Sequence, residues 1–291
     1  MAHGPPAASH DITARARTEE PDRYLAALLA PPAARPGLLA LAAFLAEIRL
    51  TTLHVREPMM GAIRLQWWRD AVAAVGPGNR SGHPVADALG EAILAYDLPK
   101  PALIRLLDAH EADLSRDLPA DDQAAADYLE ATEGVAFALA ISMADPHPSA
   151  QEDAGAGIRS AALAYGLARG LGRLPITLAR GGCILSADRL AAASIDPAAI
   201  RRQPPAPKTA ARLENVVRGL ETRARAALDE ARGRFGGRGR GTVAALLPLA
   251  MVEPYFAAQN REGFRRLEQT ADVTALKRSW RLWRAHRRGR F

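Results

Sequence analysis

Residues 38–53 read LLALAAFLAEIRLTTL, and this stretch decides the fold class. Its large apolar residues recur at spacings of three and four, at Leu38, Leu41, Phe44, Leu45 and Ile48. This spacing places them on one face of an α-helix, whereas the apolar residues of a half-buried strand alternate every second position. The stretch therefore predicts a long helix whose apolar face packs into a core.

Helical periodicity continues on both sides of this stretch. We expect further helices at residues 61–75, 84–96, 102–114, 123–143, 150–174, 208–232 and 242–262. Segments rich in proline, glycine or aspartate separate them, at residues 76–78, 97–99, 145–148 and 204–207. No segment has the composition of a β-strand. The sequence predicts an all-α, single-domain helical bundle at residues 22–265, a disordered lead-in at 1–21 and a basic amphipathic tail at 266–291.

The net charge of +6 is concentrated in the tail. Residues 273–291 contain seven lysines and arginines and no acidic residue. Subtracting those seven charges from +6 leaves −1 for residues 1–272. The charge therefore belongs to one short segment and indicates a partner of that segment, such as an anionic membrane surface.

The tail also has an apolar face. Val273, Leu276, Trp280 and Trp283 recur at helical spacing, and arginines including Arg281 and Arg284 occupy the other faces. A basic helix with tryptophans on one face is typical of segments that lie on an anionic membrane surface. The alternative is a helix docked on the body with its arginines in solvent. We expect Leu276, Trp280, Trp283, Arg281 and Arg284 to contact a membrane.

Several classes of protein are excluded by what the sequence lacks. A single cysteine, Cys183, excludes an intrachain disulfide framework and a cysteine-based zinc site. The chain has no Walker A loop, dinucleotide-binding glycine motif, nucleophile elbow or His-Glu-x-x-His motif. It also has no uninterrupted apolar run of membrane-spanning length and no secretory signal pattern in residues 1–20. We therefore expect a cytoplasmic protein that is peripheral to the inner face of the cytoplasmic membrane.

Acidic residues one helical turn apart are the candidate magnesium ligands. Asp113 and Asp117 form one such pair, and Asp127, Glu130 and Glu133 form a stripe at spacing three. Carboxylates on one helix face can share a magnesium ion that also binds a diphosphate. The alternative is that both sets are solvent-facing, and one pair alone does not supply two-sided diphosphate chemistry.

Two further features each have a binding interpretation and a structural one, and the structural one is favoured: core packing for a tryptophan pair and a loop for a Gly/Arg segment. Adjacent Trp67 and Trp68 lie about 100° apart on a helix, so that one can enter the core while the other meets a neighbouring helix or a partner. The segment at residues 233–241, GRFGGRGRG, resembles an RGG nucleic-acid segment, but one short copy between helices favours a loop. We do not expect nucleic acid to be a partner.

The ordered set of motifs resembles the squalene/phytoene synthase family. The matching stretches are residues 23–25, 41–44, 63–71, 83–89, 106–114, 127–134, 165–168 and 244–255. The resemblance implies an all-α isoprenoid-synthase fold around a central apolar cavity. Active members of that family join two prenyl diphosphates, using magnesium ions held by two Asp-rich motifs.

This chain departs from both motifs. The aspartate positions of the first motif that the resemblance implies fall on Arg49, Leu50 and Leu53, which cannot bind magnesium. The stretch expected to hold the second motif, residues 170–181, contains no acidic residue. The stretch EPMMGAIRLQWW at residues 57–68 instead resembles the non-catalytic branch typified by an assembly factor for respiratory complex I.

We therefore expect a non-catalytic protein without a cofactor. Its expected partners are a protein client, including respiratory-complex subunits, and an anionic membrane surface, with a prenyl or other apolar ligand in the retained cavity. The alternative is a divergent magnesium-dependent prenyl transferase with relocated ligands, among them Asp113, Asp117 or Glu133. The expected substrate-binding residues are Arg49, Tyr165, Arg173 and Arg180. The expected interaction residues are Arg64, Gln66, Trp67, Trp68 and Arg69.

Overall fold

The computed structural model describes residues 7–55, 57–115, 117–145, 147, 154–180, 184–201 and 206–291. These residues form helices and no strands, as expected. The first half contains α1 (Ala7–Glu19), α2 (Pro21–Leu29), η1 (Pro32–Ala34), α3 (Arg35–His54), α4 (Pro58–Ala73), α5 (Pro84–Tyr96), α6 (Lys100–Ser115), α7 (Asp122–Leu129), η2 (Glu130–Gly134) and α8 (Val135–Ala144). The second half contains α10 (Ala154–Gly172), α11 (Leu174–Arg180), α12 (Ala187–Ala192), α13 (Pro197–Arg201), α14 (Pro207–Phe235), α15 (Arg240–Leu246), η3 (Leu247–Met251), α16 (Val252–Gln259) and α17 (Ala275–Arg288).

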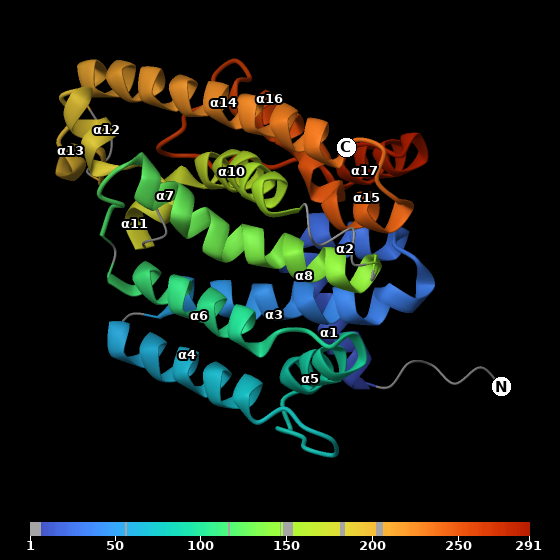
Figure 1. Ribbon diagram of the computed structural model, residues 1–291. Coiled ribbons are helices and arrows are strands. Elements are labelled where there is room, and N and C mark those ends of the chain that lie inside the picture. Colours follow the sequence, from blue (N-terminus) through green and yellow to red (C-terminus); the bar gives the residue numbers. More distant parts are fainter. Residues whose placement is uncertain are drawn as a thin grey trace.

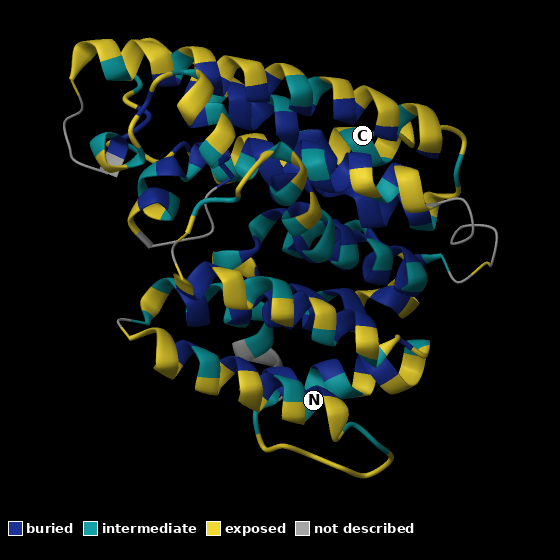
Figure 2. Cartoon of the chain, turned by 60° about the vertical axis from the view of Figure 1, so that its left-hand side comes forward, coloured by how far each residue is buried: buried dark blue, intermediate teal, exposed yellow. Residues whose placement is uncertain are grey.

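Helix α3, the predicted core helix, lies inside the bundle. Its Leu41, Phe44 and Ile48 are fully buried, and α1, α2, α5 and α6 pack around it. Helix α14 lies along one edge of the molecule above α10, while α4 lies at the opposite edge (Figure 1). Buried residues gather between the helices and exposed residues follow their outer faces (Figure 2). The predicted all-α bundle is confirmed.

Two predicted helices are interrupted in the structure. The expected helix at residues 123–143 contains a π-helical turn, η2, between α7 and α8. The expected helix at 242–262 is divided into α15, the 3₁₀ turn η3 and α16, which ends at Gln259. Pro248 explains this second division, because a proline removes one helical hydrogen bond and clashes with the preceding turn.

The expectation of a disordered lead-in is wrong for its described residues. Residues 7–19 form helix α1, which packs against α3 and α2. Ala16 is fully buried, and Arg15 pairs with Glu47 of α3 at 2.7 Å. The polar composition concealed a helix that is stabilised by tertiary contacts.

The expected tail is part of the bundle. Helix α17 packs against η3 and α2, and its Leu282 is fully buried. Arg266, at the start of the expected tail, is buried and donates hydrogen bonds to Glu214, Glu221 and Gln259. Residues 266–291 are therefore held by the same core as the rest of the chain.

Two helical stretches are long and apolar enough to cross a membrane by composition. They are Pro32–His54 and Arg240–Gln259, and 67% and 78% of their most apolar windows are buried within the fold. Core helices pass the same test of length and composition. Burial in the bundle accounts for the apolar character of both stretches.

Candidate functional site

A cavity of about 550 Å³ opens between α3, α6, η2, α10 and α11, next to the junction of α1 and α2. Leu45, Leu129 and Ile184 supply apolar parts of its wall, while charged side chains gather at one side. The resemblance implied a cavity that is central and apolar. The structure has a cavity in the expected place, but its wall combines apolar and charged groups.

The charged side of the cavity is an arginine–glutamate network. Arg23 donates to Glu133 at 2.5 Å and to Glu20 at 3.2 Å. Arg169 donates to Glu20 and lies 3.4 Å from Glu133. Arg49 donates to the Glu19 carboxylate at 2.9 Å, and its Nε lies 3.4 Å from Glu20. We call these six residues the cavity ion network.

Burial and charge act in opposite directions on this network. Burial alone would raise the pKa of Glu20, but the guanidinium groups of Arg169 and Arg23 outweigh it and hold this pKa below its usual range. Burial would likewise lower the pKa of Arg169, but Glu20 and the groups around it keep that pKa well above its usual range. Both groups are therefore charged at neutral pH, and each neutralises the other.

The π-helical turn η2 positions one member of the network. A π turn adds a residue to a helical turn and changes the direction of the side chains that follow, and such turns often occur at functional sites. Glu133 lies in this turn, and its carboxylate meets both Arg23 and Arg169. The sequence predicted Glu133 as part of a largely solvent-facing stripe and, in the alternative function, as a relocated magnesium ligand.

Two expected substrate-binding arginines line the cavity. Arg49 is half-buried, and its Nε has no hydrogen-bond partner. Arg173 is half-buried, and within the described part of the chain its side chain makes no ion pair. The structure therefore brings these two guanidinium groups together at one cavity.

The other two expected substrate-binding residues have different positions. Tyr165 is buried beneath the cavity and does not line it, because its hydroxyl donates to Asp22 at 2.9 Å. Tyr255 donates to the same carboxylate at 2.7 Å, and so does the Nε of Arg278 at 2.7 Å. The placement of Tyr165 is thus structural. Arg180 ends helix α11, and its side chain lies outside the described residues.

Asp113 and Asp117 do not form a pair. Helix α6 ends at Ser115, so that Asp117 lies beyond the helix and is exposed. Asp113 is buried at the cavity, 2.9 Å from His110 Nδ1, and accepts a hydrogen bond from Tyr128 at 3.1 Å. Burial raises the pKa of Tyr128 well above its usual range, with a further contribution from Asp113, so Tyr128 stays a neutral donor.

The donor set of this cavity does not fit the magnesium ions that the resemblance implies. Glu20 pairs with three arginines, Glu133 pairs with two, and Asp113 is bound by His110 and Tyr128. Among the residues that the structure describes, no group of three or more histidine, cysteine or acidic side chains is arranged to hold a metal ion. Divalent magnesium requires several oxygen ligands that are free to bind it.

The expected interaction segment lies on α4, where it divides between two faces. Trp68 is buried against Phe44 with ring centroids 5.2 Å apart, while Trp67 is 41% exposed. Arg64 and Gln66 are also exposed, with Gln66 bound to Asp70 on the same helix. Arg69 instead pairs with Asp108 at 2.7 Å and with Glu111 at 2.5 Å on α6. Trp68 and Arg69 therefore hold α4 in place, and Arg64 and Trp67 face outward.

An exposed apolar strip surrounds Trp67. Met59, Met60 and Ile63 are 67%, 44% and 56% exposed, and they lie within the first turns of the same helix. We call Met59, Met60, Ile63 and Trp67 the α4 strip. Exposed apolar groups at this density are typical of surfaces that contact another molecule.

Helix α17 has features of both interpretations of the tail, a helix docked on the body and a helix that contacts a membrane. Leu276, Trp280 and Trp283 are 83%, 58% and 43% exposed, and the two tryptophan rings stack at 5.1 Å. Arg284 is exposed, whereas Arg281 is half-buried and donates to the Ala250 carbonyl at 3.3 Å. The helix is thus docked through one face and presents an apolar face to its surroundings. We call Leu276, Trp280 and Trp283 the tryptophan face.

Four important residues were missed from the sequence: Glu20, Asp22, Arg169 and Arg278. Arg169 follows Tyr165 by one helical turn, which is the one local signal that the sequence contains. The contacts that join these residues across the fold, Tyr165–Asp22, Arg169–Glu20 and Arg278–Asp22, span 143, 149 and 256 positions along the chain. Contacts over such separations leave no pattern in a single sequence.

Comparison with known proteins gives a family and a fold. A family model described as squalene/phytoene synthase matches residues 16–284. A solved dehydrosqualene synthase with bound ligand superposes with a TM-score of 0.77 at 12% identity, over 97% of each chain. A squalene synthase HpnC from Alicyclobacillus acidocaldarius superposes with a TM-score of 0.72 at 16% identity, over 90% of this chain and 97% of that one. At these identities the two structures show the fold alone.

Curated relatives match over a shorter stretch. The protein named NADH dehydrogenase (ubiquinone) complex I, assembly factor 6, from Mus musculus is 30% identical over 125 residues, which is 43% of this chain and 38% of the relative. Its counterpart from Homo sapiens is 32% identical over 98 residues, which is 34% of this chain and 29% of the relative. The chain thus matches well under half the length of these relatives.

Proposed function

Because the chain belongs to the squalene/phytoene synthase family over residues 16–284, we propose that it is a non-catalytic member of that family. In this proposal it acts as a binding or assembly factor at a membrane surface, peripheral to the inner face of the cytoplasmic membrane. Its client is a protein, of the kind that assembles into respiratory complex I. The relatives named as complex I assembly factors support this client class.

The cavity ion network is the observation that carries the non-catalytic part. Ionisation of an allylic diphosphate needs divalent cations to neutralise the leaving group. One position where the family resemblance implies a magnesium ligand is Arg49, and the stretch expected to hold the second motif contains Arg173 and no acidic residue. The nearby Glu20 and Glu133 are already bound by arginines. A guanidinium can bind a phosphate but supplies no ligand for a metal ion.

The two exposed apolar surfaces support the binding part. The tryptophan face of α17 is suited to the interfacial layer of a membrane, where indole rings are favoured. The α4 strip lies on a helix at the other side of the molecule from α17 (Figure 1). One surface is therefore available for a membrane while the other, with exposed Arg64, is available for a protein client.

A turnover assay tests the non-catalytic part. Purified protein with Mg²⁺ and farnesyl or geranylgeranyl diphosphate should release no diphosphate above the buffer blank, while a squalene synthase run in parallel releases it. Robust diphosphate release with a coupled prenyl product would overturn the non-catalytic part of the proposal.

Co-purification tests the client part. Purification of the tagged chain from its own cells should retain NADH dehydrogenase subunits. A Trp67→Ser/Ile63→Ser variant should lose them, and a Leu94→Ser variant, which changes an exposed apolar residue on α5, should keep them.

A divergent prenyl transferase is the second candidate, and the retained cavity of about 550 Å³ favours it. Under this candidate Asp113, which lines the cavity, would be required for turnover. The Asp113→Asn variant should then be inactive, and Asp117→Asn should be unaffected because Asp117 is exposed outside helix α6. Equal activity in both variants removes Asp113 as a ligand.

A further inference from the structure

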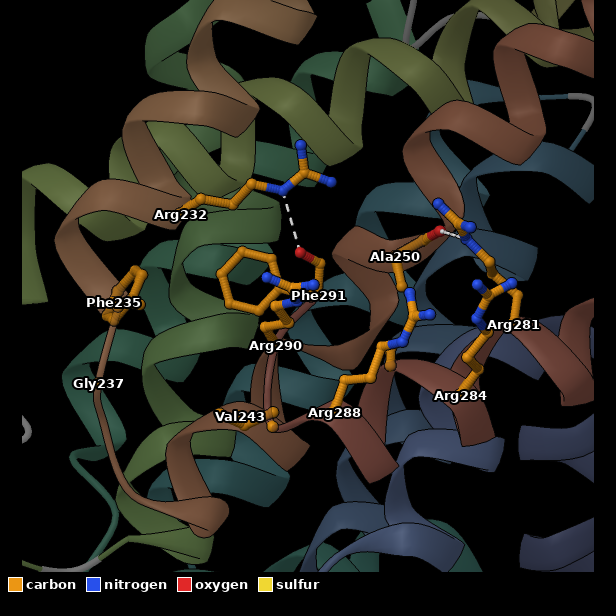
Figure 3. Close-up of a pocket in the computed structure, with 13 residues that line it drawn as sticks. Arg232, Phe235, Gly237, Val243, Ala250, Arg281, Arg284, Arg288, Arg290 and Phe291 are labelled. Atoms are coloured by element: carbon orange, nitrogen blue, oxygen red, sulfur yellow. Dashed lines mark hydrogen bonds between the residues drawn. The ribbon is translucent and has the colours of Figure 1, made fainter.

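A second cavity, of about 580 Å³, lies on another side of helix α17 from the first. It is enclosed by the end of α14, by α15 and η3, and by α17 with the residues that follow it (Figure 3). It shares no lining residue with the cavity that holds the ion network. We call it the arginine pocket.

The lining of the arginine pocket is strongly basic. Five of its thirteen lining residues are arginines, and none has an acidic side chain. The five are Arg232, Arg281, Arg284, Arg288 and Arg290, and their side chains gather around the same space (Figure 3). Arginine forms paired hydrogen bonds to phosphate oxygens, so a cluster of this kind favours a phosphate-bearing ligand.

Two of these arginines are fixed and three are free. Arg232 donates from Nε to the Phe291 oxygen at 3.0 Å and pairs with Asp229 at 3.1 Å, and Arg281 is held by the Ala250 carbonyl. Arg284, Arg288 and Arg290 are exposed, and within the described residues their guanidinium groups have no acidic partner. The pocket therefore contains fixed positive charge together with unused donors.

The backbone builds this pocket through a tight helix end. Gly289 has a φ of +63°, its N–H donates to the His286 carbonyl at 3.0 Å, and the Arg290 N–H donates to the Ala285 carbonyl at 3.2 Å. This pattern is a Schellman motif, which reverses the chain at a helix end and favours glycine. The turn directs Phe291 back to Arg232 of α14, which closes one wall of the pocket.

A titratable neighbour has a positively charged environment. Burial lowers the pKa of His286 below its usual range, and the charges of Arg240 and Arg287 lower it further. The C-terminal end of α17 therefore lies close to the positive charges of Arg240 and Arg287.

The arginine pocket adjoins the tryptophan face. At about 100° per residue, Arg281, Arg284 and Arg288 fall on a stripe of α17 between the tryptophan face and the docked face of Arg278 and Leu282. If Trp280 and Trp283 enter the apolar layer of a membrane, the polar headgroups of that membrane lie beside this arginine stripe.

We propose that the arginine pocket binds the phosphate headgroup of an anionic phospholipid while the tryptophan face enters the interfacial layer. This inference rests on the membrane part of the proposed function and names the lipid class. A lipid is favoured over nucleic acid because Leu276 offers no surface for base stacking, and Trp280 and Trp283 stack on each other. The ligand is a lipid whose phosphate is not covered by an ammonium group, such as phosphatidate.

Vesicle flotation with matched charge variants tests the proposal. Wild-type protein should bind phosphatidylcholine vesicles that contain phosphatidate more tightly than vesicles of equal surface charge that contain phosphatidylserine. The Arg284→Gln/Arg288→Gln variant should lose about tenfold or more of its affinity for phosphatidate vesicles and lose this preference. The control Lys277→Gln/Arg287→Gln removes two charges from the same helix outside the pocket lining. It should lose less affinity and keep the preference. Unchanged circular dichroism and melting temperature verify folding.

Generic attraction to an anionic surface depends on the number of charges near it. Equal losses of vesicle affinity in the two double variants would therefore overturn the proposal that the arginine pocket binds the headgroup. Tight binding of inorganic phosphate in solution, with vesicle binding unchanged in Arg284→Gln/Arg288→Gln, would assign the pocket to a free anion and overturn the lipid proposal. Loss of RNA binding alone in that variant would overturn it in favour of nucleic acid.

The two proposals fail in different ways. If wild-type protein binds no vesicle of any composition, the membrane part of the proposed function fails together with this inference. If it binds vesicles through Trp280 and Trp283, as loss of binding in Trp280→Ser/Trp283→Ser would show, but without dependence on the pocket, the pocket inference alone fails.

Discussion

Replacement of Asp22 by asparagine removes the negative charge from a fully enclosed cluster. The Asp22 side chain is 2% exposed and accepts hydrogen bonds from Tyr165, Tyr255 and Arg278. Arg278 is itself 8% exposed at its side chain. The pKa of Tyr255 is raised, first by burial and then by the charge of Asp22, so the tyrosine remains a neutral donor. The variant therefore leaves a buried guanidinium without its nearest counter-ion.

The expected cost follows from that geometry. Loss of one partner of a buried ion pair typically costs about 3–5 kcal/mol. Arg278 keeps Asp272 at 3.1 Å, but that carboxylate is 81% exposed, and such a pair contributes less than about 1 kcal/mol. Asparagine also keeps one acceptor oxygen for the tyrosines. We expect Asp22→Asn to lower the free energy of unfolding by about 3 kcal/mol, at the low end of that range.

Urea denaturation measures this loss. With a slope of about 3 kcal/mol/M for a chain of this size, the midpoint should fall by about 1 M. The Asp22→Asn/Arg278→Met variant, which removes both charges, should be more stable than Asp22→Asn alone. As a control, Glu91→Gln breaks an exposed pair with Arg80 and should change the midpoint little. Additive losses for Asp22→Asn and Arg278→Met would refute the coupling, and so would equal midpoints for Asp22→Asn and Glu91→Gln.

Three further predictions follow from the same structure. The pKa of Glu20 is lowered in the folded state, so its stabilisation is complete above the unfolded value of about 4.3 and is lost as pH falls below it. Glu20→Gln should therefore flatten the dependence of the urea midpoint on pH between neutral and acid conditions, and a parallel dependence would contradict this. Trp68→Ala should lower the free energy of unfolding by about 3–5 kcal/mol because the Trp68 ring is buried, whereas Trp67→Ala should lower it by less than about 1 kcal/mol. Thermal or urea unfolding measures both, and equal losses would contradict the different burial of the two rings. Gly289→Val should cost about 1–2 kcal/mol because φ is +63°, whereas Gly289→Asn should cost less, and identical melting temperatures would contradict the strained turn.

The local features of the fold were predictable from the sequence. Helix α3 occupies residues 35–54, against an expectation of 38–53, because an apolar face at spacings of three and four is a local pattern. The division of Trp67 and Trp68 between an exposed and a buried position follows from the same helical geometry, although the sequence did not predict which of the two is buried. The tryptophan face of α17 was also visible, since it lies within one short helix.

The features that the sequence did not predict depend on distant residues. Tyr165 was expected in the cavity, but its hydroxyl is directed to Asp22, which is 143 residues away. Arg278 was expected with the other basic residues of the tail, yet it is the residue that docks α17. The π turn that positions Glu133 was not predicted either, and in the structure it packs against α10.

The Asp22 cluster also sets the order in which the molecule can be completed during synthesis. Asp22 lies in the second helix, while Arg278 is made 256 residues later. At typical elongation rates that interval is roughly 10 to 50 s. During this time the Asp22 carboxylate lacks its partner Arg278, which is on α17. Helix α17, which carries the tryptophan face, therefore docks after the helices that precede it in the chain are already available to pack.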